Sequence, residues 1–493
     1  MLCLALVARA QVGDLPRCTP AEQGVPTQAV IDMVDALLTL PETEIHHLMV
    51  LRNGHVIAEA HPAPFAAEDA HTLFSASKTF VSMAVGIAIG ENRLRLTDRV
   101  ATFFPGELPD TISDNLAAMT VRDLLIMGSG ITPDWTMRNL CDNWEQTWLA
   151  KPVAKPAQDL LYDSMSTFML SAIVQRVTGK TTLEYLQERM FTPMHITTAD
   201  WEQSPGGVNT GGWGLRLQAE SQAKLGLLLL QRGAWNSQQL VPHDWVEQAI
   251  AVQTNYANVK PSDAVTDGNA GYGYQIWRCK WPTAFRADGA LGQYIVVDDN
   301  SDVVVVINGA SMRGHDELAC IWNHLLPALS DAPLPAEPAA QARLEKLCAG
   351  AALPKAFSGK KAGRLPSQLR LDGKNSLGIA TVDFEADVMR LTYGDGRTEA
   401  LPLDFKQWTQ APLQQFPPYS IGARNRFGAL NHNFRTAGHA AWTSRSTLVV
   451  QQQYVNWYSA TTFTFDFKKG LLTLVNNYAM RNVEQVPFTV IAQ

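Results

Sequence analysis

The sequence predicts an α+β fold that is followed by a separate antiparallel β-domain. The chain has 493 residues, more than one ordinary domain holds. In its first two thirds, strand-like segments stand before and after a long part in which helical patterns dominate. Beyond the first 340 residues, apolar and polar residues alternate, which is typical of half-buried strands. We therefore expect an N-terminal extension over 1–19, an α+β domain over 20–330, a linker over 331–340 and a β-domain over 341–493.

The α+β domain begins with a predicted helix and a hairpin. Pro26–Leu40 carries apolar residues at helical spacing, and Asn53-Gly54 marks a two-residue turn between two strands. Because neighbouring side chains of a strand point to opposite faces, we expect that His46 and His47 cannot bind one metal ion together. The further elements that we expect are helices at Val121–Met127, Phe168–Thr178, Glu220–Leu228 and Asp316–Leu326 and strands at His46–Arg52, His55–Ala58, Gly271–Trp277, Leu291–Val297 and Val303–Asn308.

The segment after residue 330 changes in character. Asp331–Ala340 is rich in proline and alanine, which favours an exposed linker. The part beyond it has no nucleophile motif, metal-binding cluster or phosphate-binding loop, so we expect it to supply no catalytic group. Its predicted strands are Ile379–Phe384, Val388–Tyr393, Thr447–Gln452, Thr461–Phe467 and Leu471–Val475.

Composition and charge narrow the function classes. The net charge of −7 and the lack of a long Lys/Arg run argue against nucleic acid as a partner. The six cysteines are scattered and form no C-x-x-C motif, so neither a zinc site nor a disulfide framework is predicted, and we expect no metal or cofactor. Leu2–Ala10 resembles the second half of a secretory signal, which favours export, periplasmic or secreted, over a cytoplasmic location. No stretch reaches the roughly 20 apolar residues that a membrane-spanning helix needs.

The strongest chemical signal is a serine three residues before a lysine, Ser75 and Lys78. The segment from Ser75 to Ile89 is apolar nearly all round, which predicts a buried helix on which the two side chains lie one above the other. At the helix N-terminus, free N–H groups favour a developing oxyanion. Lys78 could take the proton of Ser75 if burial lowered its pKa from about 10.4. The alternative is an N-cap serine beside a surface lysine, because S-x-x-K is common by chance.

Two later segments could complete such a site. Tyr162 and Ser164 stand just before the predicted helix Phe168–Thr178. Further on, Ala287 and Gly289 lie at the start of a strand, where a glycine lets the backbone approach a substrate closely. Each segment alone is also an ordinary loop or strand-entry turn.

Together and in this order, the three segments resemble the motifs of the serine β-lactamase and penicillin-binding protein superfamily. The likeness is greatest to its class C-like branch of family VIII esterases, D-amino-acid peptidases and amide hydrolases. That branch has S-x-x-K, then Y-x-N or Y-x-S, then K-T-G, H-T-G or a degenerate X-X-G. The resemblance covers residues 20–330 and implies an antiparallel sheet flanked by helices plus a helical subdomain. Further similar segments are Leu51–Gly54, Leu124–Gly130, Gly211–Leu215 and Tyr272–Tyr274.

The resemblance also implies roles for individual residues. Ser75 becomes the acylated nucleophile, Lys78 its partner and Tyr162 the proton carrier. Ser164 orients the amine of Lys78 or the substrate, and the oxyanion hole consists of the N–H groups of Ser75 and Ala290. These parts amount to a covalent two-step hydrolysis with preorganised oxyanion donors.

One departure from the family pattern bears on the substrate. Ala287 stands where many members carry Lys or His, so one cation for a substrate carboxylate is missing. We therefore expect a serine hydrolase that acts on a neutral small ester or amide. The alternatives are a β-lactamase or D-amino-acid peptidase of the penicillin-binding type, and a catalytically silent binding or scaffold member. An α/β-hydrolase and a metallohydrolase are disfavoured because G-x-S-x-G and H-E-x-x-H are absent.

Overall fold

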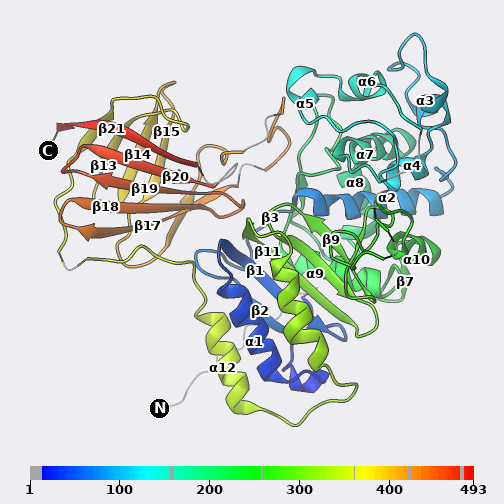
Figure 1. Cartoon of the computed structure of the whole chain (residues 1–493), viewed down its shortest axis with the longest axis horizontal. Coiled ribbons are helices and arrows are strands. Elements are labelled where there is room, and N and C mark those ends of the chain that lie inside the picture. Colours follow the sequence, from blue (N-terminus) through cyan, green and yellow to red (C-terminus); the bar gives the residue numbers. More distant parts are fainter. Residues whose placement is uncertain are drawn as a thin grey trace.

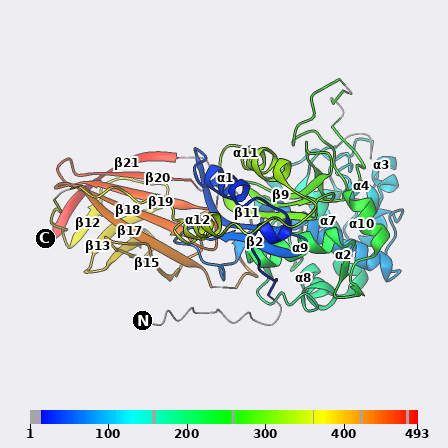
Figure 2. The same cartoon turned by 90° about the horizontal axis from the view of Figure 1, so that it is seen from below.

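The computed structural model describes residues 14–155, 160–256, 259–260, 262–359, 361–419, 423–431, 433–477 and 482–492. A sheet flanked by helices lies beside a helical part, and a second antiparallel sheet lies at the other end of an elongated molecule (Figures 1 and 2). The expected α+β class with a following antiparallel β-structure is confirmed. The expected signal segment, Leu2–Ala10, lies outside the described residues.

The first sheet has the strand order β2-β1-β11-β10-β9-β8 in the described part of the chain, with antiparallel neighbours. Helices α1 (Thr27–Leu38) and α12 (Pro338–Ala349) cover one face, and α9 (Ala219–Leu230) packs on the other. Two apolar cores, one on each face, hold the sheet in place. The strands are β1 (Thr43–Arg52), β2 (His55–Ala60), β8 (Trp277–Arg278), β9 (Ala284–Gly289), β10 (Gln293–Asp298) and β11 (Val303–Ser311).

A bulge in β1 changes the expected direction of two histidines. The register against β11 shifts between Ile45 and His47, so His46 is an extra residue. Both histidines are buried, and their rings lie 4.0 and 5.6 Å from the ring of Phe65. The expectation that they face opposite sides is therefore wrong, because the bulge cancels the alternation. Among the described residues, no group of three or more His, Cys, Asp or Glu side chains could hold a metal ion.

The helix that follows Ser75 runs between the sheet and the helical part (Figure 1). A 3-10 turn, η2 (Phe74–Ala76), leads into α2 (Ser77–Gly90), which is buried along almost all of its length. Helix α2 packs against α7 (Ser164–Thr178) and β9, and Gly86 allows the ring of Trp245 to lie where a Cβ would stand. The helix was predicted from Ser75 onward, and the tighter turn accounts for the difference of two residues.

The remaining elements of the first 330 residues build the helical part and the connections to it. The segment Gly271–Trp277 was expected to be a strand, but only its last residue enters one. Gly271 and Gln275 have positive φ angles, which break the extended backbone. The elements are η1 (Ala21–Gln23), β3 (His71–Thr72), η3 (Val100–Phe103), α3 (Asp114–Ala118), α4 (Val121–Leu125), α5 (Met137–Leu140), α6 (Trp144–Leu149), α8 (Thr182–Leu186), η4 (Gln187–Phe191), β4 (Asp200–Trp201), β5 (Leu215–Leu217), β6 (Ala234–Trp235), β7 (Gln238–Gln239), α10 (His243–Ile250), α11 (Asp316–Cys320), η5 (Ile321–Leu325) and η6 (Leu326–Ala328).

The end of the first domain lies later than the expected linker at 331–340. Helix α12 begins at Pro338, inside that segment, and packs against α1 and β2. Its side chain Leu344 is buried in the core of the first sheet. The chain therefore leaves this core only after residue 349, and the second sheet begins at Gln368. Among the described residues, no helix is long and apolar enough to span a membrane.

The second sheet curls so far that its two ends meet. In the described part of the chain the strand order is β15-β14-β13-β12-β21-β20-β19-β18-β17-β16, with all neighbours antiparallel. The N–H of Ala440 donates a hydrogen bond to the carbonyl of Asp404 at 2.7 Å, next to β15. The strands are β12 (Gln368–Leu371), β13 (Ile379–Phe384), β14 (Val388–Tyr393), β15 (Thr398–Pro402), β16 (Thr409–Pro412), β17 (Arg435–Ser444), β18 (Thr447–Tyr454), β19 (Ala460–Asp466), β20 (Leu471–Asn476) and β21 (Asn482–Ala492).

Candidate active site

Lys78 lies at the centre of a small buried network. Its side chain is 1% exposed. Nζ lies 2.9 Å from Oγ of Ser75, 2.9 Å from Oγ of Ser164 and 2.7 Å from the carbonyl oxygen of Gly212. The carbonyl can only accept, whereas either hydroxyl can donate or accept. The network is therefore complete when the amine is charged and also when it is neutral and accepts a proton from a serine.

The surroundings of Lys78 favour the neutral amine. Burial is the main cause that lowers the pKa of Lys78 to about 7; Asp163 and Asp288 act in the opposite direction, and the nearby charge of Arg138 adds to the lowering. At neutral pH a large fraction of the amine is thus unprotonated and can act as a base. From the sequence alone, a lowered pKa of Lys78 was only a condition for its role as a base.

Tyr162 stands beside the side chains of Lys78 and Ser75. Nζ of Lys78 lies 4.8 Å from the centroid of the tyrosine ring. Burial raises the pKa of Tyr162 well above its usual value, and the side chain of Ser75 partly offsets this rise. The phenol therefore keeps its proton at neutral pH and can give it to a reacting group. Its ring is fixed by Trp277, 5.5 Å away between centroids.

Ser164 is positioned by the N-terminus of α7. The carboxylate of Asp163 caps this helix and accepts the backbone N–H groups of Met165 and Ser166 at 3.0 and 3.1 Å. It also accepts the indole N–H of Trp148 at 3.1 Å. Asp163 was not among the predicted site residues. An acidic residue directly before a predicted helix is a capping signal that could have identified it.

The segment around Gly212 brings a carbonyl to Lys78. A Cβ on Gly212 would stand 2.4 Å from the carbonyl oxygen of Ser164, so only glycine fits there. The neighbouring Gly211 and Gly214 both have positive φ angles. The family resemblance includes this segment, but no role in the site was predicted for it.

The third predicted segment, which contains Ala287 and Gly289, lies directly beside the residues that precede Ser75. A Cβ on Gly289, the last residue of β9, would stand 2.2 Å from the carbonyl oxygen of Leu73. Ala290 follows at the exposed end of the strand. The backbone stretches that carry the N–H groups of Ser75 and Ala290 are thus neighbours.

Side chains around Ala287 alternate across the strand. Ala287 is 2% exposed and packs in the core with α2, whereas Arg286 and Asp288 share the other face with 2.8 Å between Nε and Oδ2. His315 lies 3.3 Å from the same carboxylate. Burial alone would raise the pKa of Asp288, but these two partners hold it below its usual value.

Arg138 is a buried cation that the sequence did not single out. Its side chain is 1% exposed, and its guanidinium lies 4.4 and 4.5 Å from the ring centroids of Trp135 and Trp213. Nη2 has no hydrogen-bond partner among the described residues. Burial lowers the pKa of Arg138 to about 10, so the guanidinium is charged at neutral pH.

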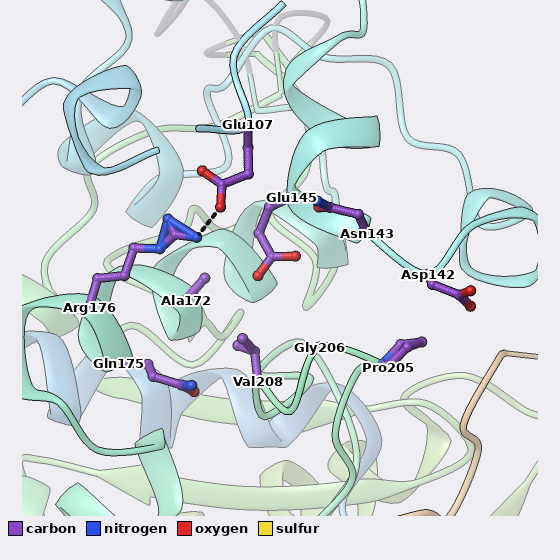
Figure 3. Close-up of a pocket in the computed structure, with 10 residues that line it drawn as sticks. All are labelled: Glu107, Asp142, Asn143, Glu145, Ala172, Gln175, Arg176, Pro205, Gly206 and Val208. Atoms are coloured by element: carbon purple, nitrogen blue, oxygen red, sulfur yellow. Dashed lines mark hydrogen bonds and ion pairs between the residues drawn. The ribbon is translucent and has the colours of Figure 1, made fainter. Parts of the chain in front are cut away.

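A separate surface cavity of 430 Å³ is lined by residues of α6 and α7 and by neighbouring loops (Figure 3). Arg176 and Glu107 form an ion pair of 2.7 Å at its edge, and the carboxylate of Glu145 points into it. Neither Ser75 nor Lys78 lines this cavity, so it is distinct from the lysine network.

Comparisons with known proteins show likeness in sequence and in fold. The chain is 26% identical over 326 residues to the 6-aminohexanoate-dimer hydrolase of Paenarthrobacter ureafaciens, covering 61% of this chain and 82% of that protein. A candidate 6-aminohexanoate-dimer hydrolase from Bacillus anthracis has a similar structure, with a TM-score of 0.51, 19% identity and coverage of 64% and 85%. A candidate β-lactamase from Bacteroides dorei DSM 17855 has a TM-score of 0.51 at 16% identity, with coverage of 66% and 99%.

The two solved structures show that the fold is shared. A family model gives the membership, because the model described as Beta-lactamase matches residues 44–326, more than half of the chain. The matched range includes the three segments with Ser75, Tyr162 and Gly289. The chain belongs to the Beta-lactamase family of hydrolases.

Proposed function

We propose that this protein is a serine hydrolase that forms an acyl-enzyme on Ser75 and acts on a neutral small ester or amide. The observation that carries the proposal is the distance of 2.9 Å between Nζ of Lys78 and Oγ of Ser75, in a site where burial lowers the pKa of the lysine to about 7. A base of that pKa can remove the serine proton at neutral pH.

In the acylation half, Oγ of Ser75 attacks the acyl carbon while Lys78 takes its proton. The oxyanion accepts hydrogen bonds from the N–H groups of Ser75 and Ala290. Tyr162, which is protonated at rest, gives its proton to the leaving alcohol or amine, and the proton on Lys78 replaces it. Deacylation reverses the order: a water molecule loses a proton to the Tyr162–Lys78 pair, and Ser75 regains its own.

The immediate surroundings support a substrate without a carboxylate near the scissile bond. The third segment supplies no cation at Ala287, whose side chain is buried in the core. Arg286 already has a partner in Asp288 at 2.8 Å. The relative from Paenarthrobacter is named as a hydrolase of a 6-aminohexanoate dimer, which supports amides beside esters. Because a linear dimer of an amino acid keeps a free carboxylate, this name supports the amide bond and not the neutral charge of the substrate.

Arg138 favours a second candidate, a β-lactamase or D-amino-acid peptidase of the penicillin-binding type. Such substrates carry a carboxylate, and Nη2 of Arg138 is a buried donor with no partner among the described residues. Glu202 and Asp163 act on the charge of Arg138, and a substrate carboxylate that bound Nη2 would remove the cost of leaving this buried donor without a hydrogen bond. A silent scaffold member is the weakest alternative, because Ser75, Lys78 and Tyr162 are all present and lie close together.

Covalent labelling tests the proposal directly. A fluorophosphonate probe followed by peptide mapping should modify Ser75, and Ser75→Ala should lose both the label and the turnover of p-nitrophenyl butyrate. Ser77 is the matched control serine and should stay unlabelled. Its hydroxyl is not bonded to Lys78 but accepts a hydrogen bond from the backbone N–H of Leu215 at 3.2 Å. Label on Ser77 or Ser129, or full turnover by Ser75→Ala, would end the assignment.

A further inference from the structure

The C-terminal part of the chain touches the residue directly before the nucleophile. Four aromatic residues from it, Tyr419, Phe427, Trp457 and Tyr458, share one apolar cluster with Phe74, and we call these four the aromatic clamp. The ring of Phe74 lies 5.9 Å from that of Tyr419, 6.3 Å from that of Trp457 and 5.1 Å from that of Tyr458. Figure 1 shows the second sheet sending a loop across to the helical part.

Phe74 has a backbone conformation that needs such support. Its φ angle is +45°, in the left-handed region that aromatic residues rarely adopt. Such strain persists only where the surroundings hold it. The side chain is 8% exposed, and three of its ring contacts come from the clamp.

The same cluster reaches the other half of the oxyanion site. Leu291, which follows Ala290, packs against the cluster and has a φ angle of +64°. Each of the two N–H groups assigned to the oxyanion hole therefore has a neighbour with left-handed backbone in contact with the cluster. The neighbours are Phe74 for Ser75 and Leu291 for Ala290.

Polar contacts fix the C-terminal part on both sides of the clamp. On one side Arg426 forms a buried ion pair of 2.6 Å with Glu202. On the other side Arg435 pairs with Asp69 at 2.8 Å, and Asn456 donates to the carbonyl of Ala70 at 3.1 Å. Asp69 and Ala70 lie on the segment that leads through β3 to Phe74. The clamp is thus held against this segment by directional bonds as well as by apolar contact.

We propose that the C-terminal domain is a positioning part of the active site. Its aromatic clamp holds Phe74 and Leu291 in left-handed conformations, and so aims the N–H groups of Ser75 and Ala290 at one point. The domain supplies no group that reacts. This inference rests on the proposed acyl-enzyme mechanism and extends it, because it makes the rate depend on a domain outside the matched family region.

The test is Tyr458→Leu in the full-length protein, with p-nitrophenyl butyrate as substrate. Loss of the ring lets Phe74 relax, and a displacement of about 1 Å at a reacting centre costs roughly 100-fold in rate. We expect kcat to fall about 10- to 100-fold while KM changes by less than about threefold. The second-order rate of fluorophosphonate labelling at Ser75 should fall by a similar factor. Tyr458→Phe keeps the ring and should retain at least half of the wild-type kcat.

Phe384→Leu is the matched control for stability. Phe384 packs in the core of the second sheet against Phe465 and Phe467, away from the clamp. Its replacement should lower Tm about as much as Tyr458→Leu but leave kcat unchanged below that temperature. Equal kcat losses in the two leucine variants, or wild-type kcat in Tyr458→Leu, would overturn the inference. So would an equal loss in Tyr458→Phe, which would assign the effect to the hydroxyl.

Failure of the mechanism itself gives a different result. If Ser75→Ala keeps its turnover, the proposed function is wrong whatever Tyr458→Leu does. If Ser75→Ala is inactive and Tyr458→Leu is fully active, only the positioning role of the C-terminal domain is wrong.

Discussion

At the scale of single residues, burial decides what Lys78 can do. An exposed lysine has a pKa of about 10.4 and is almost fully charged at neutral pH. At 1% exposure the charged form loses its hydration, and the pKa falls to about 7 even though Asp163 and Asp288 favour the charge. The same burial raises the pKa of Tyr162, so one environment yields a base and a proton donor side by side.

The pKa of Lys78 leads to a prediction about pH. The proposed base works only without its proton, so kcat/KM for p-nitrophenyl butyrate should rise with pH through an apparent pKa near 7. About one pH unit below that value, the rate should be roughly a tenth of its plateau. A pH–rate profile from pH 5 to 9 measures this. Lys78→Arg, which stays charged throughout, should show no such rise, and a wild-type rise near pH 10 would contradict the assignment.

Residue types and spacing identify Ser75, Lys78, Tyr162 and Ser164 as partners, and the structure places them in one network. Spacing works here because S-x-x-K acts within one helical turn, and because the family resemblance links the distant segments. Arg138 was missed for the opposite reason. Trp135 is a local neighbour, but the burial of Arg138 also needs Trp213, which is far away in the sequence, and no local pattern reveals that contact.

At the scale of elements, local patterns predict what local contacts determine. The strands Ile379–Phe384 and Val388–Tyr393 have the expected bounds, although their alternation is only loose and the register between them shifts after Ile379. The bulge at His46 and the helix α12 were not predicted. The first depends on pairing with β11, and the second on packing of Leu344 into the core of the first sheet. Both are set by tertiary contacts rather than by propensity.

One element-scale prediction concerns the loop that brings Gly212 to Lys78. Gly212→Ala places a methyl group 2.4 Å from the carbonyl oxygen of Ser164, so the loop or α7 must move. The carbonyl that accepts from Lys78 moves with it, and we expect kcat/KM to fall at least tenfold. Gly206→Ala is the control, since the nearest atom to its new methyl group is Oγ of Ser204 at 3.7 Å. Equal activity of the two variants would show that the Gly212 carbonyl is dispensable.

At the scale of the whole molecule, both parts of the chain contact the proposed site. The Beta-lactamase region carries the side chains that we propose to react, and the C-terminal part packs on Phe74 and binds the loop with Arg138 through the N–H of Arg424 at 2.9 Å. The formal net charge of −7 adds a long-range effect, because it disfavours the approach of anionic substrates at low salt.

The charge of the preferred substrate is the last prediction. We expect wild-type kcat/KM to be at least tenfold higher for p-nitrophenyl butyrate than for nitrocefin or mono-p-nitrophenyl glutarate, both of which carry a carboxylate. A charge-assisted hydrogen bond is worth about 1.5–3 kcal/mol, or roughly 10- to 100-fold, and no cation stands at Ala287 to make one. Ala287→Lys is a poor test, because it would place an ammonium group in the core.

Arg138→Met is the sharper variant, because it removes the buried guanidinium and keeps an unbranched apolar side chain between Trp135 and Trp213. If substrates reach the site without touching Arg138, the ratio of the kcat/KM values for the butyrate and the glutarate should stay within about threefold of the wild-type ratio. A wild-type preference for the glutarate that Arg138→Met abolishes would contradict the neutral-substrate proposal. Nη2 of Arg138, which has no hydrogen-bond partner among the described residues, would then be the carboxylate-binding group. The penicillin-binding type of hydrolase would replace the esterase or amidase as the proposed function.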